Sequence, residues 1–159
     1  MFRPSSSPQA SQPMLRISKL TDHGIVLLVR FAQEASGTTL TAREMSEATE
    51  LPLPVVSKML KSLASSDLLA SQRGARGGYQ LARKPEAVNV AEIVEALEGP
   101  IALMECVAAD GLCDQESHCG LRAPWQRINS AIQTTLTQVS LAELAADLPP
   151  RNRTTLAIA

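Results

Sequence analysis

Two helix start signals lie close together between residues 41 and 65, and this arrangement restricts the fold more than any other feature. Thr41-Ala42-Arg43-Glu44 is a capping-box sequence, in which the Thr hydroxyl accepts an amide of the first turn and the Glu side chain bonds back to the cap. We expect this short helix to run to about Thr49. The Glu50-Leu51-Pro52-Leu53 link is tight, and Pro54 stands in the first turn of the next helix, where proline is tolerated.

The second of these helices has one apolar face and one polar face. Its apolar residues recur at helical spacing and should face the core: Val56, Met59, Leu60 and Leu63. Its outer face is small, polar and basic, and carries Val55, Ser57, Lys58 and Lys61. Two short helices, a tight turn and a basic outer face on the second helix predict a helix-turn-helix.

A basic, glycine-rich segment follows directly. Residues 68–73 and 79–82 are typical of two strands, joined by a turn over residues 74–78 that contains three glycines. Arg76 stands at the tip of this hairpin, where arginine is well placed to reach a narrow minor groove, and Arg73 ends the first strand. A basic hairpin after a helix-turn-helix is typical of a wing, so we predict a winged helix-turn-helix domain over residues 14–88 that binds double-stranded DNA. The expected contact residues are Val55, Ser57, Lys58, Lys61, Arg73, Arg76, Gly77 and Tyr79.

The local charge agrees with this interpretation, although the net charge of the 159-residue chain is only −1. Residues 51–84 contain six Lys or Arg and a single Asp, whereas residues 91–148 contain nine acidic and two basic residues. A basic segment on a nearly neutral protein is what a phosphate-contacting surface requires. An ordinary solvated surface is the alternative that charge alone leaves open.

The remaining helices are predicted from apolar periodicity and end signals. Aromatic residues make up only 3% of the chain, so the core must be aliphatic. The apolar run Ile25–Ala32 predicts a buried first helix that begins at Thr21 or Asp22 and stops near Gly37. Asn89-Val90-Ala91-Glu92 caps a fourth helix, which should end near residues 99–100.

A stripe of apolar residues marks a long helix from about Pro124: Trp125, Ile128, Ile132, Leu136 and Val139. A domain of this size has little other core for the stripe to cover, so we expect the helix to pack against its copy in a homodimer that matches a palindromic site. Packing within one chain is the alternative. The fold class is therefore mainly α, with a β-hairpin wing and a long C-terminal dimerisation helix.

The regions outside the winged domain complete the predicted organisation. Residues 89–148 should form the cysteine loop and dimerisation helices, with a last short helix capped by Ser140. Residues 1–13 and 149–159 are expected to be disordered or flexible tails. No apolar stretch is long enough for a membrane span and the first 13 residues lack a secretory signal, so we expect a cytoplasmic protein.

All three cysteines lie in one polar segment, at Cys106, Cys113 and Cys119. Their odd number argues against a disulfide framework, and their wide spacing differs from the close pairs of structural zinc sites. Wide spacing suits an iron–sulfur cluster, with a weaker fourth ligand from Asp22, His23 or His118. Zinc and a metal-free thiol switch remain alternatives. Catalysis is disfavoured because no phosphate loop or paired-carboxylate motif accompanies the cysteines, and we expect no small-molecule substrate.

Together these features resemble the Rrf2 family of bacterial winged-helix regulators over about residues 14–148. The resemblance rests on the opening segment 15–22, the helix-turn-helix, the wing residues 73–79, and the three-cysteine loop followed by Trp125. It is strongest to regulators of the SUF iron–sulfur assembly system. This resemblance implies a dimer that binds a cluster and represses or activates cluster-assembly genes according to cluster status.

The resemblance also implies ligands, residue by residue. The family's cluster cysteines fall on Cys106, Cys113 and Cys119, and the position where some relatives have a histidine ligand is Arg122 here. Other relatives, including nitric-oxide sensors, complete a 4Fe–4S cluster with an aspartate from the partner subunit, and Asp22 stands at that position. The resemblance thus implies a 4Fe–4S rather than a 2Fe–2S cluster, bound by a repressor. The alternative is a repressor of the same family that senses nitric oxide or redox state.

Overall fold

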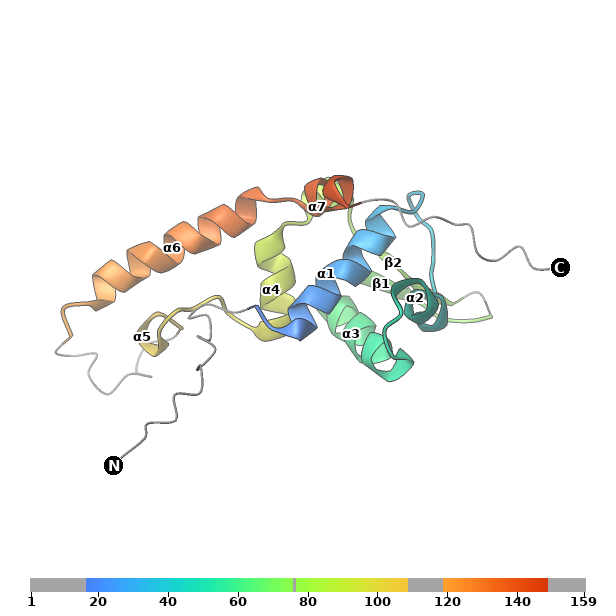
Figure 1. Cartoon of the computed structure of the whole chain (residues 1–159), viewed down its shortest axis with the longest axis horizontal. Coiled ribbons are helices and arrows are strands. Elements are labelled where there is room, and N and C mark those ends of the chain that lie inside the picture. Colours follow the sequence, from blue (N-terminus) through green and yellow to red (C-terminus); the bar gives the residue numbers. More distant parts are fainter. Residues whose placement is uncertain (1–16, 76, 109–118, 149–159) are drawn as a thin grey trace, which may run out of the picture.

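The computed structural model describes residues 17–75, 77–108 and 119–148 of the chain (Figure 1). The two predicted tails lie outside these residues, as do Arg76, Cys113, His118 and the side chain of Cys106. The helices are α1 (Lys19–Ala32), α2 (Ala42–Thr49), α3 (Leu53–Ser65), α4 (Val90–Glu98), α5 (Glu105–Ala108), α6 (Arg122–Gln138) and α7 (Leu141–Asp147). Strands β1 (Leu69–Gln72) and β2 (Gly78–Leu81) form an antiparallel hairpin, and a short 3-10 helix, η1, spans Pro85–Ala87. The mainly α, winged helix-turn-helix fold is confirmed.

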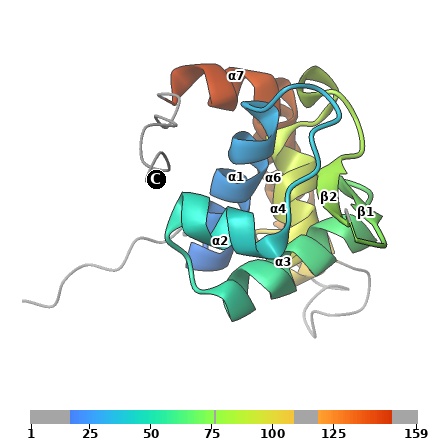
Figure 2. The same cartoon turned by 90° about the vertical axis from the view of Figure 1, so that its right-hand side faces the viewer.

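The elements form a helical body with one projecting arm. Helices α1 to α4 and the hairpin gather on one side of Figure 1, and α7 covers the upper end of α1. Helix α6 extends away from α3 and the hairpin, and contacts α4 and α5. Seen from the end, α2 and α3 lie in front of α4, with the hairpin beside them (Figure 2). Within the described residues, no helix is both long and apolar enough to span a bilayer.

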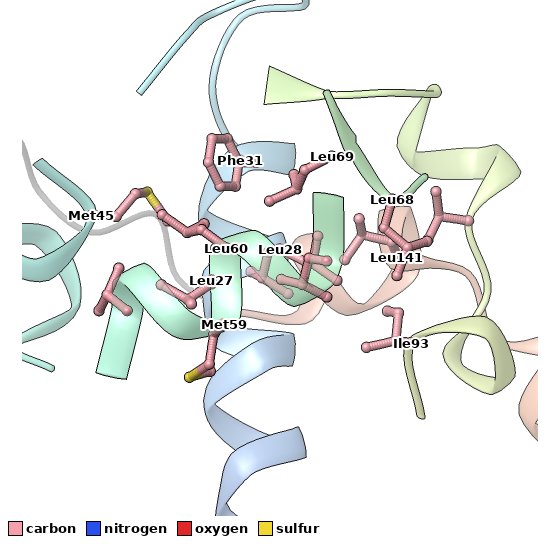
Figure 3. Close-up of a cluster of buried hydrophobic side chains, with 14 residues drawn as sticks. Leu27, Leu28, Phe31, Met45, Met59, Leu60, Leu68, Leu69, Ile93 and Leu141 are labelled. Atoms are coloured by element: carbon pink, nitrogen blue, oxygen red, sulfur yellow. The ribbon is translucent and has the colours of Figure 1, made fainter. Parts of the chain in front are cut away.

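An aliphatic core holds this body together, as the low aromatic content requires (Figure 3). Leu27 and Leu28 of α1 are completely buried in it, and Phe31 is its aromatic member. All four residues that were predicted to face inward from α3 are buried there: Val56, Met59, Leu60 and Leu63. Ile93 of α4 and Leu141 of α7 belong to the same cluster. The core therefore joins the helix-turn-helix and the hairpin to the helices that follow them.

The predicted capping signals form as reciprocal hydrogen bonds. The Thr41 hydroxyl accepts the N–H of Glu44 at 3.2 Å, and a Glu44 carboxylate oxygen accepts the N–H of Thr41 at 2.7 Å. The same arrangement begins α4 and α7, through the pairs Asn89–Glu92 and Ser140–Glu143. These helix starts are encoded within four residues and need no tertiary contact.

The start of α1 differs from the prediction. Ser18, rather than Thr21 or Asp22, is the N-cap, and its hydroxyl accepts the N–H of Thr21 at 3.2 Å. Thr21 lies inside the first turn and is fully buried, whereas Asp22 is exposed. The Ser18 cap places Thr21 inside the helix, where its hydroxyl donates to Glu98 at the end of α4, a contact between residues far apart in sequence.

The hairpin is anchored by a third segment of chain. Strands β1 and β2 pair in the register Leu69 with Leu81 and Gln72 with Gly78. Strand β1 is one residue shorter at each end than predicted, and β2 is shifted by one residue toward the N-terminus. Leu40 and Tyr79 exchange both backbone hydrogen bonds at 2.8 Å, which attaches β2 to the chain before α2. At Gly77 a Cβ would lie 2.7 Å from the carbonyl oxygen of Gln72, so the tight turn requires glycine.

The apolar stripe on α6 is only partly covered within the chain. Ile128 is 47% exposed, and the other four stripe residues are intermediate in burial: Trp125, Ile132, Leu136 and Val139. The one buried residue of α6 is a polar one, Asn129. Contacts with α4 and α5 therefore account for part of the stripe, and the predicted homodimer remains a prediction.

Helices α1 and α4 approach closely where α1 has a glycine. A Cβ on Gly24 would collide with Cδ1 of Leu97. Glycine normally weakens a helix, by about 1 kcal/mol relative to alanine. Its presence in the middle of α1 is explained by the room that Leu97 needs.

We predict that the effect of Gly24→Ala reverses with the residue at position 97. In the wild-type background the substitution should lower the free energy of unfolding by about 1–2 kcal/mol, because Leu97 must move. With Leu97→Ala the same substitution should raise it by about 1 kcal/mol, because only the helix propensity remains. Urea unfolding of the four proteins measures both effects. An equal loss in both backgrounds would exclude this contact as the cause.

Candidate DNA-binding surface and cysteine segment

The outer face of α3 presents the side chains that were predicted to contact DNA. Val55, Lys58 and Lys61 are exposed and Ser57 is half-buried, while the opposite face of α3 lies in the core. The connection from α2 turns sharply because Glu50 adopts a left-handed conformation with φ of 58°. Ser46 fixes this turn by donating its hydroxyl to the carbonyl of Leu51 at 2.6 Å. The helix-turn-helix therefore exposes a short face with two lysines.

The wing places its predicted residues in different environments. Arg73 is exposed just beyond β1, and Gly77 forms the tight turn, with its N–H donated to the carbonyl of Gly74 at 2.9 Å. Tyr79 is half-buried and packs against the core. Arg76, predicted at the tip, lies outside the described residues. Arg73 is thus the described wing residue whose charge is available to a phosphate.

One arginine of the basic segment is already engaged in the fold. Arg83 pairs with both carboxylate oxygens of Glu92, at 3.1 and 3.3 Å, and also donates to the carbonyl of Ala87 at 3.1 Å. This bidentate pair joins the end of the hairpin to α4. Sequence charge alone counts Arg83 as part of the basic segment, although its guanidinium serves to hold η1 and α4 together.

The structure describes only part of the predicted cluster site. Helix α5 carries the backbone of Cys106, and Cys119 is a half-buried free cysteine shortly before α6. Within residues 17–75, 77–108 and 119–148, no group of three His, Cys, Asp or Glu side chains is placed to hold a metal ion. That description omits the side chains of Cys106 and Cys113, so it does not test the site.

The donor set of the chain nevertheless fits an iron–sulfur cluster. Three thiols in one segment are the soft ligands that such a cluster takes, and the free thiol of Cys119 is not committed to a disulfide. Asp22 is exposed in the first turn of α1, and its neighbour His23 is half-buried. Cys106, Cys113 and Cys119 would hold the cluster, with Asp22 as the fourth ligand.

Two polar residues that sequence reasoning missed hold the chain that leads into the cysteine segment. Glu98, the last residue of α4, accepts hydrogen bonds from the Thr21 hydroxyl and from the N–H of Ser18, the latter at 3.0 Å. Asn129 of α6 bonds to the backbone of Ile101 and Leu103. The only signal in the sequence is an asparagine next to the apolar stripe of α6. Nothing in the sequence pairs Glu98 with Thr21.

The hydrogen bonds from Thr21 and Ser18 hold the pKa of Glu98 below its ordinary value, because they stabilise the carboxylate. A lowered pKa in the folded state gives stability that is fully present above the ordinary carboxyl pKa. This stability is lost as the pH falls through the lowered value. The junction of α1 and α4 should therefore weaken in acid.

We predict that Thr21→Val lowers the free energy of unfolding by about 1 kcal/mol at neutral pH, because it removes a buried hydroxyl donor to a carboxylate. The difference from wild type should shrink below about pH 4, as Glu98 becomes protonated in both proteins. Urea unfolding of both proteins at neutral pH and below about pH 4 measures this difference in the free energy of unfolding. Thr134→Val is the matched control, because Thr134 is exposed. A deficit that is independent of pH would show that packing, rather than the charged bond, is responsible.

Comparisons with known proteins assign a family. The sequence model of the Rrf2 family, described as an iron-dependent transcriptional regulator, matches residues 17–147. Protein rrf2 of Nitratidesulfovibrio vulgaris is 27% identical over 140 residues, which cover 87% of this chain and 93% of the relative. The HTH-type transcriptional regulator IscR of Aliivibrio salmonicida is 27% identical, over 81% of this chain and 78% of the relative.

Solved structures agree with the fold. The structure of CymR, the global cysteine regulator of B. subtilis, matches with a TM-score of 0.66 and 27% identity, over 85% of this chain and 99% of CymR. IscR of T. potens matches with a TM-score of 0.62 and 23% identity, over 86% of this chain and 93% of IscR. The second likeness concerns the fold alone.

Proposed function

The chain belongs to the Rrf2 family of transcriptional regulators, and from that membership we propose that it is a homodimeric DNA-binding repressor that senses iron–sulfur cluster status. The relatives CymR of Bacillus subtilis and IscR are named as transcriptional regulators rather than as enzymes, which supports the same class here. Its proposed targets are iron–sulfur assembly genes, as the resemblance to SUF regulators implies. Because its proposed target is chromosomal DNA, the protein would act in the cytoplasm.

The observation that carries DNA binding is the exposed basic face of α3 beside the wing. Lys58 and Lys61 are exposed on a helix whose other face is locked in the core, so the helix is presented rigidly. We assign α3 to the major groove, with Val55 and Ser57 toward base edges. Arg73 and Arg76 would contact phosphates or the minor groove beside it.

We predict that Lys61→Ala and Arg76→Ala each weaken binding to duplex DNA of random sequence. Each should flatten the slope of log K against log salt by about 1, because one phosphate contact is lost. Arg127→Ala is the matched control, since Arg127 is exposed on α6, which extends away from α3 (Figure 1). Fluorescence anisotropy over a salt series measures the slopes. If the slopes and affinities of both variants equal those of wild type, α3 and the wing are not the interface.

The cysteine segment carries the proposed sensing activity. Cys106, Cys113 and Cys119 supply three thiolates, and the partner subunit's Asp22 would complete a 4Fe–4S cluster. When bound, the cluster would supply sensitivity to iron, oxidants or nitric oxide. Asp22 lies on α1, the helix that is packed against α3, so engaging this side chain would bias the position of the recognition helix. The cluster site and the DNA-binding surface would then be coupled through α1, provided that α1 has two positions that each ligand favours differently.

The proposed division of labour follows the order of the chain. Residues 14–88 would read DNA, and residues 89–148 would hold the cluster and the dimer interface. The half-exposed stripe of α6, with Ile128 as its most exposed member, supports dimerisation through this helix. Ile93 and Leu141 lie in the same core as α1 and α3, so a change in the second region is transmitted directly to the first.

We predict that anaerobically purified protein is coloured and contains iron and sulfide, and that Cys119→Ser abolishes the visible absorbance while the protein stays folded. Asp22→Ala should change or bleach the spectrum, because it removes the oxygen ligand, whereas the neighbouring His23→Ala should retain it. Absorption spectra, with circular dichroism as the test of folding, measure these effects. A colourless wild type with stoichiometric zinc would overturn cluster sensing in favour of a zinc-stabilised repressor, and a metal-free protein would favour a thiol switch.

A further inference from the structure

The chain between α4 and α5 is fastened at both ends, and we call residues 98–103 the strap. At its start, the Glu98 carboxylate accepts the Thr21 hydroxyl and the N–H of Ser18. Both donors belong to the first turn and cap of α1. The strap therefore leaves α4 tied to the end of α1 that also carries Asp22.

At the other end, Asn129 of α6 holds the strap with both groups of its amide. Its Nδ2 donates to the carbonyl of Ile101 at 2.8 Å, and its Oδ1 accepts the N–H of Leu103 at 3.1 Å. The side chain is only 4% exposed. A buried amide is costly unless its donor and acceptor are satisfied, and here the strap backbone contributes to both. Asn129 thus provides the strap with the pair of bonds that a neighbouring strand would otherwise supply.

The strap leads directly into the first cysteine. Leu103 is followed by Met104, whose carbonyl accepts the N–H groups of Val107 and Ala108 in the short helix α5. Cys106 lies in that helix, and Cys119 lies shortly before α6, the helix that carries Asn129. The two amide bonds therefore join the chain entering the cysteine segment to the helix that begins where the segment ends.

We propose that Asn129 is a positioning residue of the cluster site: by holding the strap on α6, it fixes Cys106 relative to Cys119. This inference rests on the proposed cluster function. Cluster ligands that are held in place before binding need not be ordered during binding, and groups that orient ligands without touching the metal commonly change metal affinity 10–100-fold. Through Glu98 the same strap is also tied to the first turn of α1.

The test compares full-length wild-type protein with Asn129→Ala, Asn129→Leu and Gln126→Ala, each reconstituted anaerobically with ferrous iron and sulfide. Gln126→Ala removes an exposed amide from the same helix and is the matched control. Asn129→Leu keeps the number and branching of the side-chain heavy atoms but cannot bond to the strap. Cluster loss to a ferrous chelator is followed by absorbance, amide exchange at Leu103 in the metal-free protein by mass spectrometry or NMR, and folding by thermal unfolding.

We expect both Asn129 variants to lose the cluster about 10–100-fold faster than wild type and to exchange the Leu103 amide about tenfold faster or more. Gln126→Ala should match wild type in both measurements. If wild type holds a cluster and the Asn129 variants retain it equally long, the positioning role is wrong while the proposed function stands. If wild type holds no cluster, the proposed function fails and this inference fails with it.

Discussion

The enclosure of α1 by its neighbours is the constraint on which the rest of the structure depends. Leu27 and Leu28 are completely buried in a core that also takes in residues of α2, α3, α4 and α7. Because this core is aliphatic and close-packed, a displacement of α1 must be accommodated by the helices around it. One face of α3 is fixed by that packing, which leaves its other face free to contact DNA. The first turn of α1 meets Glu98, where the chain turns toward the cysteines. Helix α3 and the chain that leads toward the cysteines thus both rest on α1.

Local signals in the sequence were sufficient for much of this fold, and the two failures differ in kind. The capping boxes at Thr41, Asn89 and Ser140 form as expected because each is completed within four residues. The start of α1 was misplaced because a local cap was overlooked: the Ser18 hydroxyl accepts the N–H of Thr21, three residues further on. Asn129 was missed for a different reason, since its partners are backbone atoms 26 and 28 residues earlier in the chain. Periodicity and end signals contain no information about such partners.

Prediction of the candidate site divides along similar lines. The outer face of α3 follows from helical spacing alone, and Val55, Lys58 and Lys61 are exposed as that spacing requires. A count of charges could not separate Arg73, which is exposed beyond β1, from Arg83, which is paired with Glu92. The three cysteines stand out in the sequence by their composition and spacing alone, because no other cysteine occurs in the chain.

The close approach of α1 and α4 also limits how sequences of this fold can diverge. Gly24 leaves room for Leu97, so a lineage that acquires a side chain at position 24 needs a shorter one at position 97. Substitutions at these two sites should therefore be accepted as a pair, even though neither residue touches DNA or carries a ligand. Residues 24 and 97 would then vary together because of helix packing alone, without any role in binding.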